Sequence, residues 1–428
     1  MASALDKLKA SLGARWDDGR TVFRADELVD KGVVSSGSLC LDYMTGIFGL
    51  PRDAVIELAG KPGVSKTTMA LCVIDNVLRL ELDRSRMRQR MLKMASEGKL
   101  SDDDKAAFER AWEGNVADLH VLSDPKLNER LDTLKLDAKR ERAALDESRG
   151  AIYLDLEGRF NRRWASRYIA PELFDKLLVV RNDTIEQATD AYAEALRSGA
   201  VAVAVLDSVG GAPTDRVFTK SAQIGNVGGN ALGMTRFSSF AENLSSKYTC
   251  LTIGINQVRD DLSGYNRLIT PGGNAWKHAC SLRIELKRKA SEVYWDIEPG
   301  TSDSQFECGF QVHARLHKNS VGRAGQACVF SFYTADCKYG KAGFDRVREI
   351  VNLAVLSGIV EKGNAGYYRY EAFPNGRVHG YEAAVEFFAN DKAAYDALYA
   401  VMRERLRSGG IDGATETFEV ATDLDVDA

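Results

Sequence analysis

The stretch AVIELAGKPGVSKTTMA, residues 54–70, decides the fold class of this chain. Its first six residues are a short apolar run that stops at a glycine, which is typical of a buried strand feeding a loop. A helical pattern, TTMALCVIDNVLRL, begins at Thr67. A strand, a glycine-containing loop and a helix in this order are the context of a phosphate-binding loop. The pattern of that loop is Gly, four residues, Gly-Lys and then Ser or Thr.

One position of this loop departs from the pattern. Gly60, Lys66 and Thr67 hold their places, but Ser65 stands where a glycine is expected before the lysine. We expect Ser65 to adopt a positive φ angle, which costs a serine about 1 kcal/mol. Gly63 remains inside the loop and carries part of the tight turn. We therefore expect a working site with some loss of stability or affinity. A chance run of small residues after a strand is the alternative that the loop alone leaves open.

Further apolar runs along the chain predict a sheet. Six of them read as strands: 151–158, 201–211, 250–257, 280–288, 307–320 and 327–335. Helical segments separate the early runs, and strands that alternate with helices predict a parallel α/β sheet. The first three runs carry Glu157, Asp207 and Gln257 at or near their ends. Each of these residues alone indicates little, since an acid at the end of a strand is often only solvated and a glutamine is common in loops. The occurrence of all three in order on successive strands is what indicates a functional site.

These polar residues suit hydrolysis of a nucleoside triphosphate, because ligands of such sheets bind outside the carboxyl ends of the strands. Backbone N–H groups of the loop would cradle the phosphates, and Lys66 would reach the β- and γ-phosphates. Thr67 would bind Mg²⁺, which Asp207 would hold through water. Glu157 would orient or deprotonate the attacking water, and Gln257 would contact the γ-phosphate and report its loss. The predicted nucleotide-binding residues of the loop are Gly60, Lys61, Pro62, Gly63, Val64, Ser65, Lys66, Thr67 and Thr68.

Residues 79–150 differ from the rest in being rich in Arg, Lys, Asp and Glu. Ser101, followed by three aspartates, marks a helix start. Apolar residues fall on two narrow heptad-like seams. The seams comprise Val73, Val77, Leu80, Met87, Met91 and Met94, and then Leu127, Leu131, Leu134, Ala138 and Leu145. We predict a helical hairpin inserted into the main domain, either a passive surface element or an arm that docks a partner.

Composition places the chain among cytoplasmic proteins. Its 428 residues are 45% hydrophobic and 28% charged, which is ordinary for a globular protein. Seven cysteines stand singly, with no CxxC, and predict reduced thiols. The first residues lack the apolar core of a signal peptide, and no apolar run approaches the ~18 residues that span a membrane. A net charge of −4 neither demands nor excludes a nucleic-acid partner.

Several segments together resemble the RecA family of recombinases. The most specific piece is the pairing of NQ at 256–257 with GGNAWK at 272–277. The match extends over about residues 1–75 and 151–428. The segments that carry it are SGSLCLDYMTGIFGLPRDAVIELAGKPGVSKTT, IYLDLEGRFNRRWA, AVLDSVGG, INQVRDD and TPGGNAWKHACSLRIELKR, with looser similarity at HKNSVGRAG.

The resemblance implies a DNA-dependent ATPase that uses ATP and Mg²⁺ and forms a helical filament on single-stranded DNA. The filament would pair this strand with a homologous duplex. ATP would lie between subunits, with Asn161 and Trp164 on its adenine side and Lys318 as a catalytic residue that reaches the neighbour's nucleotide. Trp164 as a plain core residue is the alternative. Two mobile loops, about 212–229 and 258–275, would contact DNA. The implied DNA-binding residues are Arg216, Lys220, Arg259, Arg267, Gly272, Gly273, Asn274 and Lys277.

The resemblance also divides the chain into parts. The implied fold is a RecA-like P-loop ATPase core with a mostly parallel sheet, the inserted hairpin and a small α+β C-terminal domain. The parts are an N-terminal helix and polymerisation segment (1–35), the core (36–340, with the insertion 79–150), a DNA-gating domain (341–410) and an acidic tail (411–428). The tail has six acids and no Lys or Arg, which predicts a solvated, disordered segment.

Departures from the family pattern keep other functions open. Ser65 replaces a glycine, and Asp260 and Asp261 place negative charge at the start of the second DNA loop. Ser320 stands where a second lysine is expected, although Arg323 lies close by as a substitute. These features suggest a divergent, phage-type member that would act in the cytoplasm of a bacterial host. The alternatives are a regulatory relative with weak hydrolysis and a hexameric DNA helicase or motor. A single-strand-binding protein or a loader is a further expected partner.

Overall fold

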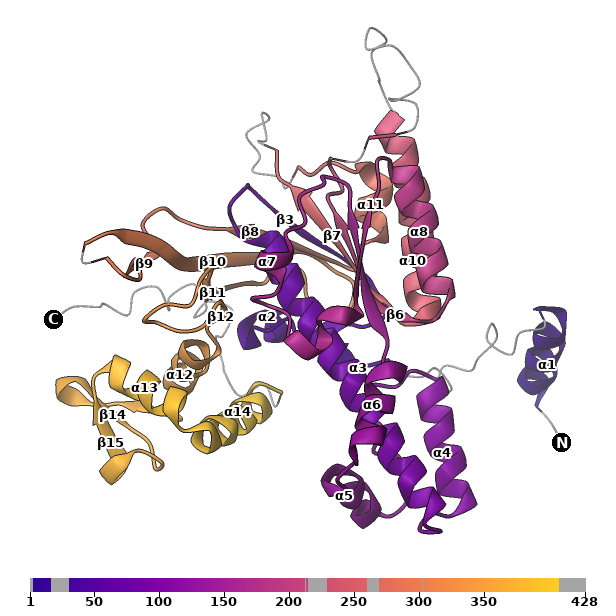
Figure 1. Ribbon diagram of the computed structural model, residues 1–428, viewed down its shortest axis with the longest axis horizontal. Helices are drawn as coiled ribbons and strands as arrows, with labels where there is room; N and C mark the ends of the chain where they lie inside the picture. The colour runs from indigo at the N-terminus through magenta and orange to yellow at the C-terminus, as the bar shows by residue number, and fades with distance from the viewer. Residues whose placement is uncertain are drawn as a thin grey trace, which may run out of the picture. The chain divides into compact units, whose positions relative to one another are not determined.

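The computed structural model describes residues 3–16, 31–211, 213–214, 229–259, 269–301 and 303–407. The chain divides into two compact units. The smaller unit comprises Met1–Gly32 and Arg86–Ala143, and the larger unit comprises Val33–Ser85 and Ala144–Ala428. No helix in the described ranges is long and apolar enough to cross a membrane. Figure 1 shows both units and labels most of their helices and many of their strands.

The larger unit is built on a sheet that contains ten of the described strands. The order is β12-β11-β10-β8-β3-β7-β6-β4-β5, and β9 pairs with β10. The pairs from β8 to β5 are parallel, and those of β10 with β8, β9 and β11 are antiparallel, as is β11 with β12. The strands are β3 (Val55–Gly60), β4 (Gly150–Asp155), β5 (Leu177–Arg181), β6 (Val201–Asp207), β7 (Leu251–Gln257), β8 (Leu282–Lys287), β9 (Val293–Ile297), β10 (Gln305–Asn319), β11 (Ala327–Tyr333) and β12 (Gly343–Phe344). The predicted α/β class with a mostly parallel central sheet is confirmed.

All six further runs read as strands contain strands, but β5, β9 and the two-residue strand β12 of this sheet were not predicted. β5 is an edge strand that follows the 3-10 helix η2 (Pro171–Lys176), and its Leu178 side chain is 59% exposed. β9 mixes aromatic, acidic and aliphatic residues, so it has no continuous apolar run. An edge position removes the burial on which pattern-based prediction of buried strands depends.

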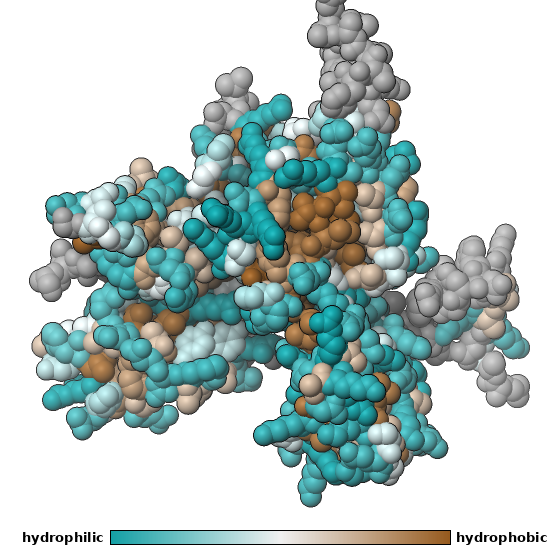
Figure 2. Space-filling model, viewed as in Figure 1, coloured by the Kyte–Doolittle hydropathy of each residue, from teal (hydrophilic) through white to brown (hydrophobic). Residues whose placement is uncertain are grey.

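Helices cover both faces of the parallel part of the sheet (Figure 1). Successive strand residues alternate between the two cores: Ile152 and Leu154 belong to one core cluster, whereas Ala151 and Tyr153 belong to the other. The first cluster includes side chains of α8 (Ile185–Arg197), α10 (Gly229–Tyr248) and α11 (Gly273–Ala279). The second includes side chains of α3 (Lys66–Ser96) and of the C-terminal helices. Figure 2 shows hydrophobic side chains gathered on the viewed face beside α8 and α10, within a largely hydrophilic surface.

The C-terminal part of the larger unit is a small α+β element, as the sequence predicted. It comprises α12 (Arg346–Leu356), β13 (Glu361–Lys362), β14 (Tyr367–Arg369), β15 (Arg377–His379), α13 (Tyr381–Asn390) and α14 (Lys392–Arg407), with the 3-10 helices η3 (Asn364–Gly366) and η4 (Pro374–Gly376). Buried Glu349 joins it to the start of α2 (Leu39–Met44), beside the short ladder of β1 (Val33–Val34) and β2 (Leu50–Pro51). Its carboxylate accepts from Ser38 Oγ at 2.5 Å and from the backbone N–H groups of Leu39 and Cys40 at 2.9 Å.

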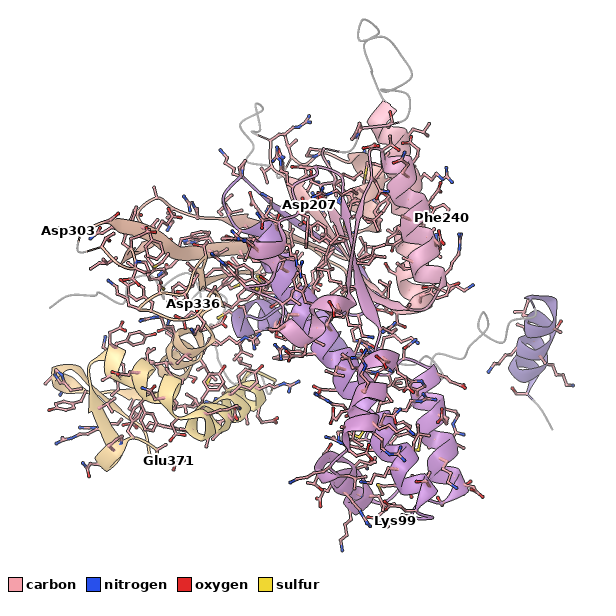
Figure 3. The ribbon with its side chains drawn as sticks, in the orientation of Figure 1. Lys99, Asp207, Phe240, Asp303, Asp336 and Glu371 are labelled. Carbon is pink, nitrogen blue, oxygen red and sulfur yellow. The ribbon has the colours of Figure 1, made fainter. Side chains whose placement is uncertain are left out.

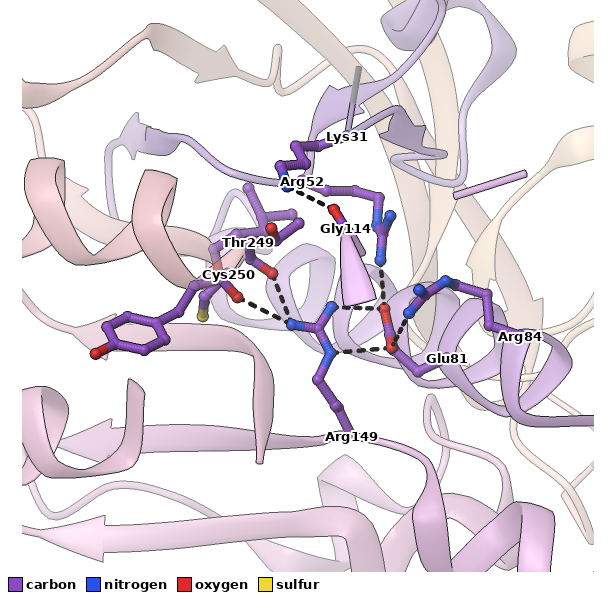
Figure 4. A network of polar contacts seen from close by, with 10 residues as sticks. Lys31, Arg52, Glu81, Arg84, Gly114, Arg149, Thr249 and Cys250 are labelled. Carbon is purple, nitrogen blue, oxygen red and sulfur yellow. Dashed lines mark hydrogen bonds and ion pairs between the residues drawn. The ribbon is translucent and has the colours of Figure 1, made fainter. Parts of the chain in front are cut away.

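A buried ion-pair network joins α3 to the loops of the sheet (Figure 4). The carboxylate of Glu81 in α3 accepts from Arg52 at 2.6 Å, from Arg84 at 3.0 Å and from Arg149 at 2.8 Å. Arg149 precedes β4 and also donates to the carbonyl of Thr249, just before β7. One helix and two strands are therefore linked through a single carboxylate.

The smaller unit is helical and has its own core. It comprises α1 (Ala4–Trp16), the last part of α3, α4 (Asp102–Glu113), α5 (Pro125–Thr133) and the start of α6 (Ala138–Glu147), so the insertion holds more helices than a simple hairpin. Ser101 caps α4 and accepts from the Asp104 N–H, as predicted. The two predicted seams meet in this core around Phe108, but Ala138 is exposed and does not extend the second seam. The core residues of the seams are Met87, Met91, Met94 and Leu131, with Leu127 and Leu134 partly buried beside them.

Candidate nucleotide-binding site

The loop between β3 and α3 has the strained turn that the sequence indicated. Ser65 has a φ angle of +59° and Gly63 one of +80°. A side chain at Gly60 is excluded for a different reason, because an added Cβ would lie 2.6 Å from the carbonyl oxygen of Leu286 in β8. The loop is therefore held close to the sheet at its start and turned sharply at Ser65, directly before Lys66.

The sheet register brings the carboxyl ends of β3, β4, β6 and β7 together at one end of the sheet. Gly60 pairs with Gln257 of β7, and Asp155 of β4 pairs with Asp207 of β6. A cavity of about 490 Å³ opens at this end. Lys66, Thr67, Glu157, Asp207 and Gln257 all line it, and Asp207 is labelled in Figure 3.

Lys66 lies against the loop that it follows. Its Nζ donates to the carbonyls of Gly60 at 2.8 Å and Lys61 at 2.9 Å. Burial lowers the pKa of Lys66, although the nearby Asp207 and Glu157 oppose this change. A triphosphate would restore favourable charge around the ammonium group, so this lysine is suited to bind an anion.

Thr67 and Asp207 form a small oxygen-rich centre. The hydroxyl of Thr67 donates to Asp207 Oδ2 at 3.1 Å, and Tyr153 also donates its hydroxyl to this carboxylate. Burial raises the pKa of Asp207, and the two hydrogen bonds act in the opposite direction. The described residues hold no group of three or more His, Cys, Asp or Glu side chains that suits a metal. One hydroxyl and one carboxylate fit Mg²⁺, which usually keeps several waters and phosphate oxygens as ligands.

Glu157 follows β4 on a loop that a buried acid holds in place. The Glu157 carboxylate pairs with Arg159 Nη1 at 3.0 Å and accepts from the Ser208 hydroxyl. Buried Asp155 accepts from the backbone N–H groups of Arg159 at 3.0 Å and Phe160 at 3.1 Å. Sequence reasoning missed Asp155, Arg159 and Ser208, although Asp155, an acid two residues before Glu157 in the sequence, was a usable signal.

A second buried acid, Glu57, was also missed. It lies on β3 and accepts from Asn256 Nδ2 at 2.6 Å, Trp276 Nε1 at 3.1 Å and Arg283 Nε at 2.6 Å. Asn256 immediately precedes Gln257, and Trp276 lies on α11 within GGNAWK. Glu57 thus connects the phosphate-loop strand with both halves of the motif pair on which the resemblance rests.

The residues expected near adenine lie beside the cavity. Asn161 caps α7 (Arg162–Ala165) by accepting from the Trp164 N–H at 3.0 Å. Trp164 Nε1 donates to the Thr68 hydroxyl at 3.1 Å. The centres of the Trp164 and Tyr168 rings lie 5.6 Å apart. Lys318 does not line this cavity; its Nζ donates to the carbonyls of Lys277 and His278.

The residues predicted to contact DNA are only partly described. Arg259 is exposed, and its N–H donates to the Ile269 carbonyl at 2.9 Å across the base of the second loop. Gly272 and Gly273 begin α11 with φ angles of +99° and +74°, followed by Asn274 and Lys277. Arg216, Lys220, Asp260, Asp261, Arg267 and the tail 411–428 lie outside the described residues.

The sequence is similar to known proteins of one family. The family model described as the RecA N-terminal domain matches residues 133–330. Protein RecA of Phytoplasma mali is 24% identical over 87% of this chain and 86% of its own length. Protein RecA of Chloroherpeton thalassium is 26% identical over 91% of this chain and 86% of its own length. Protein RecA of Cytophaga hutchinsonii is 24% identical over 97% of this chain and 93% of its own length.

The family match spans β4 to β11, which includes Glu157, Asp207 and Gln257, and the relatives align over most of the chain. The identities of 24–26% over most of the chain, together with the match to the RecA N-terminal domain, support a divergent relationship of this chain to the RecA family.

Proposed function

We propose that this chain is an ATP-dependent DNA-strand-exchange protein. The observation that carries the proposal is the convergence of Lys66, Thr67, Glu157, Asp207 and Gln257 on one cavity of a RecA-family chain. The protein would assemble on single-stranded DNA when ATP is bound and pair that strand with a homologous duplex. We place this activity in the cytoplasm, that of a bacterial host if the chain is phage-encoded.

The side chains suggest how hydrolysis proceeds. The loop N–H groups and Lys66 bind the phosphates, and Glu157 takes a proton from the water that attacks the γ-phosphorus. The bond from that phosphorus to the bridging oxygen breaks, which releases ADP and phosphate. Mg²⁺, held at Thr67 and Asp207, would supply charge neutralisation on the phosphate oxygens. Gln257, which ends β7, would contact the γ-phosphate and pass its loss to the second DNA loop.

Self-association and DNA binding complete the proposal. Edge strand β5 pairs only with β4 among the described strands, and its exposed Leu178 supports contact with another copy of the chain. Lys318 does not line the nucleotide cavity of its own subunit, which supports a role at the nucleotide of the adjacent subunit in the filament. Arg216, Lys220, Arg259, Arg267 and Lys277 would bind DNA phosphates in a salt-dependent manner, with Gly272, Gly273 and Asn274 shaping the second loop.

The C-terminal part would guide incoming duplex DNA, and the acidic tail would compete with DNA for the basic loops until Mg²⁺ screens it. A single-strand-binding protein or a loader would assist assembly. Removal of residues 411–428 should speed duplex uptake, most clearly at low Mg²⁺; unchanged uptake would refute the proposed competition by the tail.

The deciding experiment measures ATP hydrolysis with and without single-stranded DNA, for the natural chain and Glu157→Gln. We expect strong stimulation by DNA in the natural chain and a loss of about 100-fold or more in the variant, because its amide cannot accept the proton. Rates that are equal with and without DNA would contradict the proposal.

A regulatory relative is the second candidate function. The strained Ser65 and the serine at position 320 favour it, since each weakens a part that hydrolysis needs. Normal ATP binding with no DNA-stimulated hydrolysis, together with binding to a standard recombinase, would be its signature.

A further inference from the structure

Arg159 is a cation at the mouth of the cavity that neither the phosphate loop nor the proposed mechanism uses. It lines the cavity and pairs with Glu157, the proposed base, at 3.0 Å. The Arg159 side chain is 80% exposed, whereas that of Glu157 is 17% exposed. An exposed ion pair is weakly held, so the guanidinium can exchange one anion for another at little cost.

The backbone beneath Arg159 is fixed although its side chain is exposed. Asp155, 2% exposed, accepts from the N–H groups of Arg159 and Phe160 and pairs with Arg181 at 3.5 Å. Gly158 has a φ angle of +66°, which turns the chain between Glu157 and Arg159. The loop therefore presents the base and the guanidinium side by side from a rigid support.

The cavity contains a second arginine, Arg288, that is held more firmly. Arg288 pairs with Glu307 and lies 4.8 Å from the centre of the Phe310 ring, and its side chain is 33% exposed. Its ion pair and its ring contact both hold the guanidinium in place, so moving it towards a ligand costs more than moving that of Arg159. Of these two arginines, Arg159 is the one that an incoming anion can recruit more easily.

We propose that Arg159 is a phosphate-binding residue that leaves Glu157 for the γ-phosphate when ATP, rather than ADP, enters the cavity. This role rests on the proposed function. A terminal phosphate carries about two negative charges and three acceptor oxygens, so it outcompetes a single carboxylate for a guanidinium. ADP lacks this group and leaves the Arg159–Glu157 pair intact.

The exchange also controls when the base is available. While Arg159 pairs with Glu157, one carboxylate oxygen faces a cation and the other accepts from Ser208. Transfer of the guanidinium to the γ-phosphate frees a Glu157 oxygen to accept a proton from water. The base thus becomes competent only in the presence of the phosphate that it helps to remove.

The test is calorimetric titration of the full chain with Mg²⁺ and either ADP or the non-hydrolysable triphosphate adenylyl imidodiphosphate, without DNA. For Arg159→Ala we expect triphosphate binding to weaken about 10- to 100-fold, the usual worth of a charge-assisted contact. ADP binding should change by less than about threefold, and Arg159→Lys should fall between the two. The matched control is Arg236→Ala. Arg236 on α10 is an exposed arginine that pairs with Asp190 on α8, and neither residue lines the cavity.

The outcomes separate this role from the proposed function. Selective loss of triphosphate affinity in Arg159→Ala, with Arg236→Ala unchanged, supports the role. Wild-type affinities for both nucleotides in Arg159→Ala overturn it while leaving the proposed function intact, as does an equal loss of both. A natural chain that binds neither nucleotide overturns the proposed function and this role with it.

Discussion

Ser65 occupies a backbone conformation that L-residues with a side chain rarely adopt, at the turn that aims Lys66 into the cavity. The left-handed region costs a non-glycine residue about 1–2 kcal/mol. Glycine avoids this cost but loses about 0.5–1 kcal/mol through its greater freedom in the unfolded chain. The two effects oppose each other, and the steric one is the larger.

We therefore expect Ser65→Gly to raise the free energy of unfolding by up to about 1 kcal/mol and to keep nucleotide binding. The matched variant is Gly63→Ala, because Gly63 has a φ of +80° and open space around an added Cβ, so only backbone strain changes. It should lower the free energy of unfolding by about 1 kcal/mol. Urea unfolding of both variants measures these changes. Loss of ATP binding in Ser65→Gly would mean that the serine serves the site in another way.

At the scale of elements, the Glu81 network decides how α3 is attached to the sheet (Figure 4). Burial alone would raise the pKa of Glu81, but Arg149, Arg84 and Arg52 outweigh burial and hold it at about 2. A carboxyl with a depressed folded-state pKa stabilises the fold above its unfolded value of 4.5. That contribution is lost as the pH falls from 4.5 towards 2.

Glu81→Gln should lower the free energy of unfolding by about 3–5 kcal/mol at pH 7, because it leaves buried arginines without their counter-charge. The difference in unfolding free energy between the variant and the natural chain should shrink as the pH is lowered below 4.5. In that range Glu81 is protonated in the unfolded chain but still charged in the folded one, so its charge contributes less to the stability of the natural chain. The comparison variant is Glu141→Gln, which breaks the more exposed Arg86–Glu141 pair and should cost less than about 0.5 kcal/mol. A pH-independent difference for Glu81→Gln would show that packing rather than charge holds α3.

The elements that could be predicted are those whose own residues carry the pattern. The run before Gly60 and the runs ending near Glu157, Asp207 and Gln257 are buried on both faces, so they read as strands without knowledge of their neighbours. The order of the strands that brings these ends together was not predicted, because it depends on pairings between residues far apart in sequence and not on any single run. Glu57 and Glu349 were not predicted, because the partners that justify a buried acid are distant in sequence. Asp155 was missed although the backbone N–H groups that it accepts from lie only four and five residues further along the chain.

At the scale of the whole molecule, the chain has separate hydrophobic cores in its two units. One helix, α3, contributes to both: Val73 and Val77 lie in a core of the larger unit, whereas Met87 and Met91 lie in that of the smaller unit. A continuous apolar seam in the sequence therefore serves two different sets of partners. Among the residues that the structure describes, none that lines the candidate cavity belongs to the smaller unit.

This separation predicts that a cavity made in one core leaves the other unit folded. Phe108 is fully buried in the smaller unit and Phe237 in the larger, so each can be truncated as the control for the other. Phe108→Ala should destabilise the smaller unit by about 3–5 kcal/mol and leave nucleotide affinity unchanged, whereas Phe237→Ala should lower both the stability of the larger unit and its affinity. Thermal unfolding followed by circular dichroism, with and without ATP, resolves the two transitions, because only the unit that binds ATP is stabilised by it. If Phe108→Ala shifted the ATP-sensitive transition as strongly as Phe237→Ala does, the two cores would have to unfold as one cooperative unit, and the insertion would be part of the machinery that supports the site.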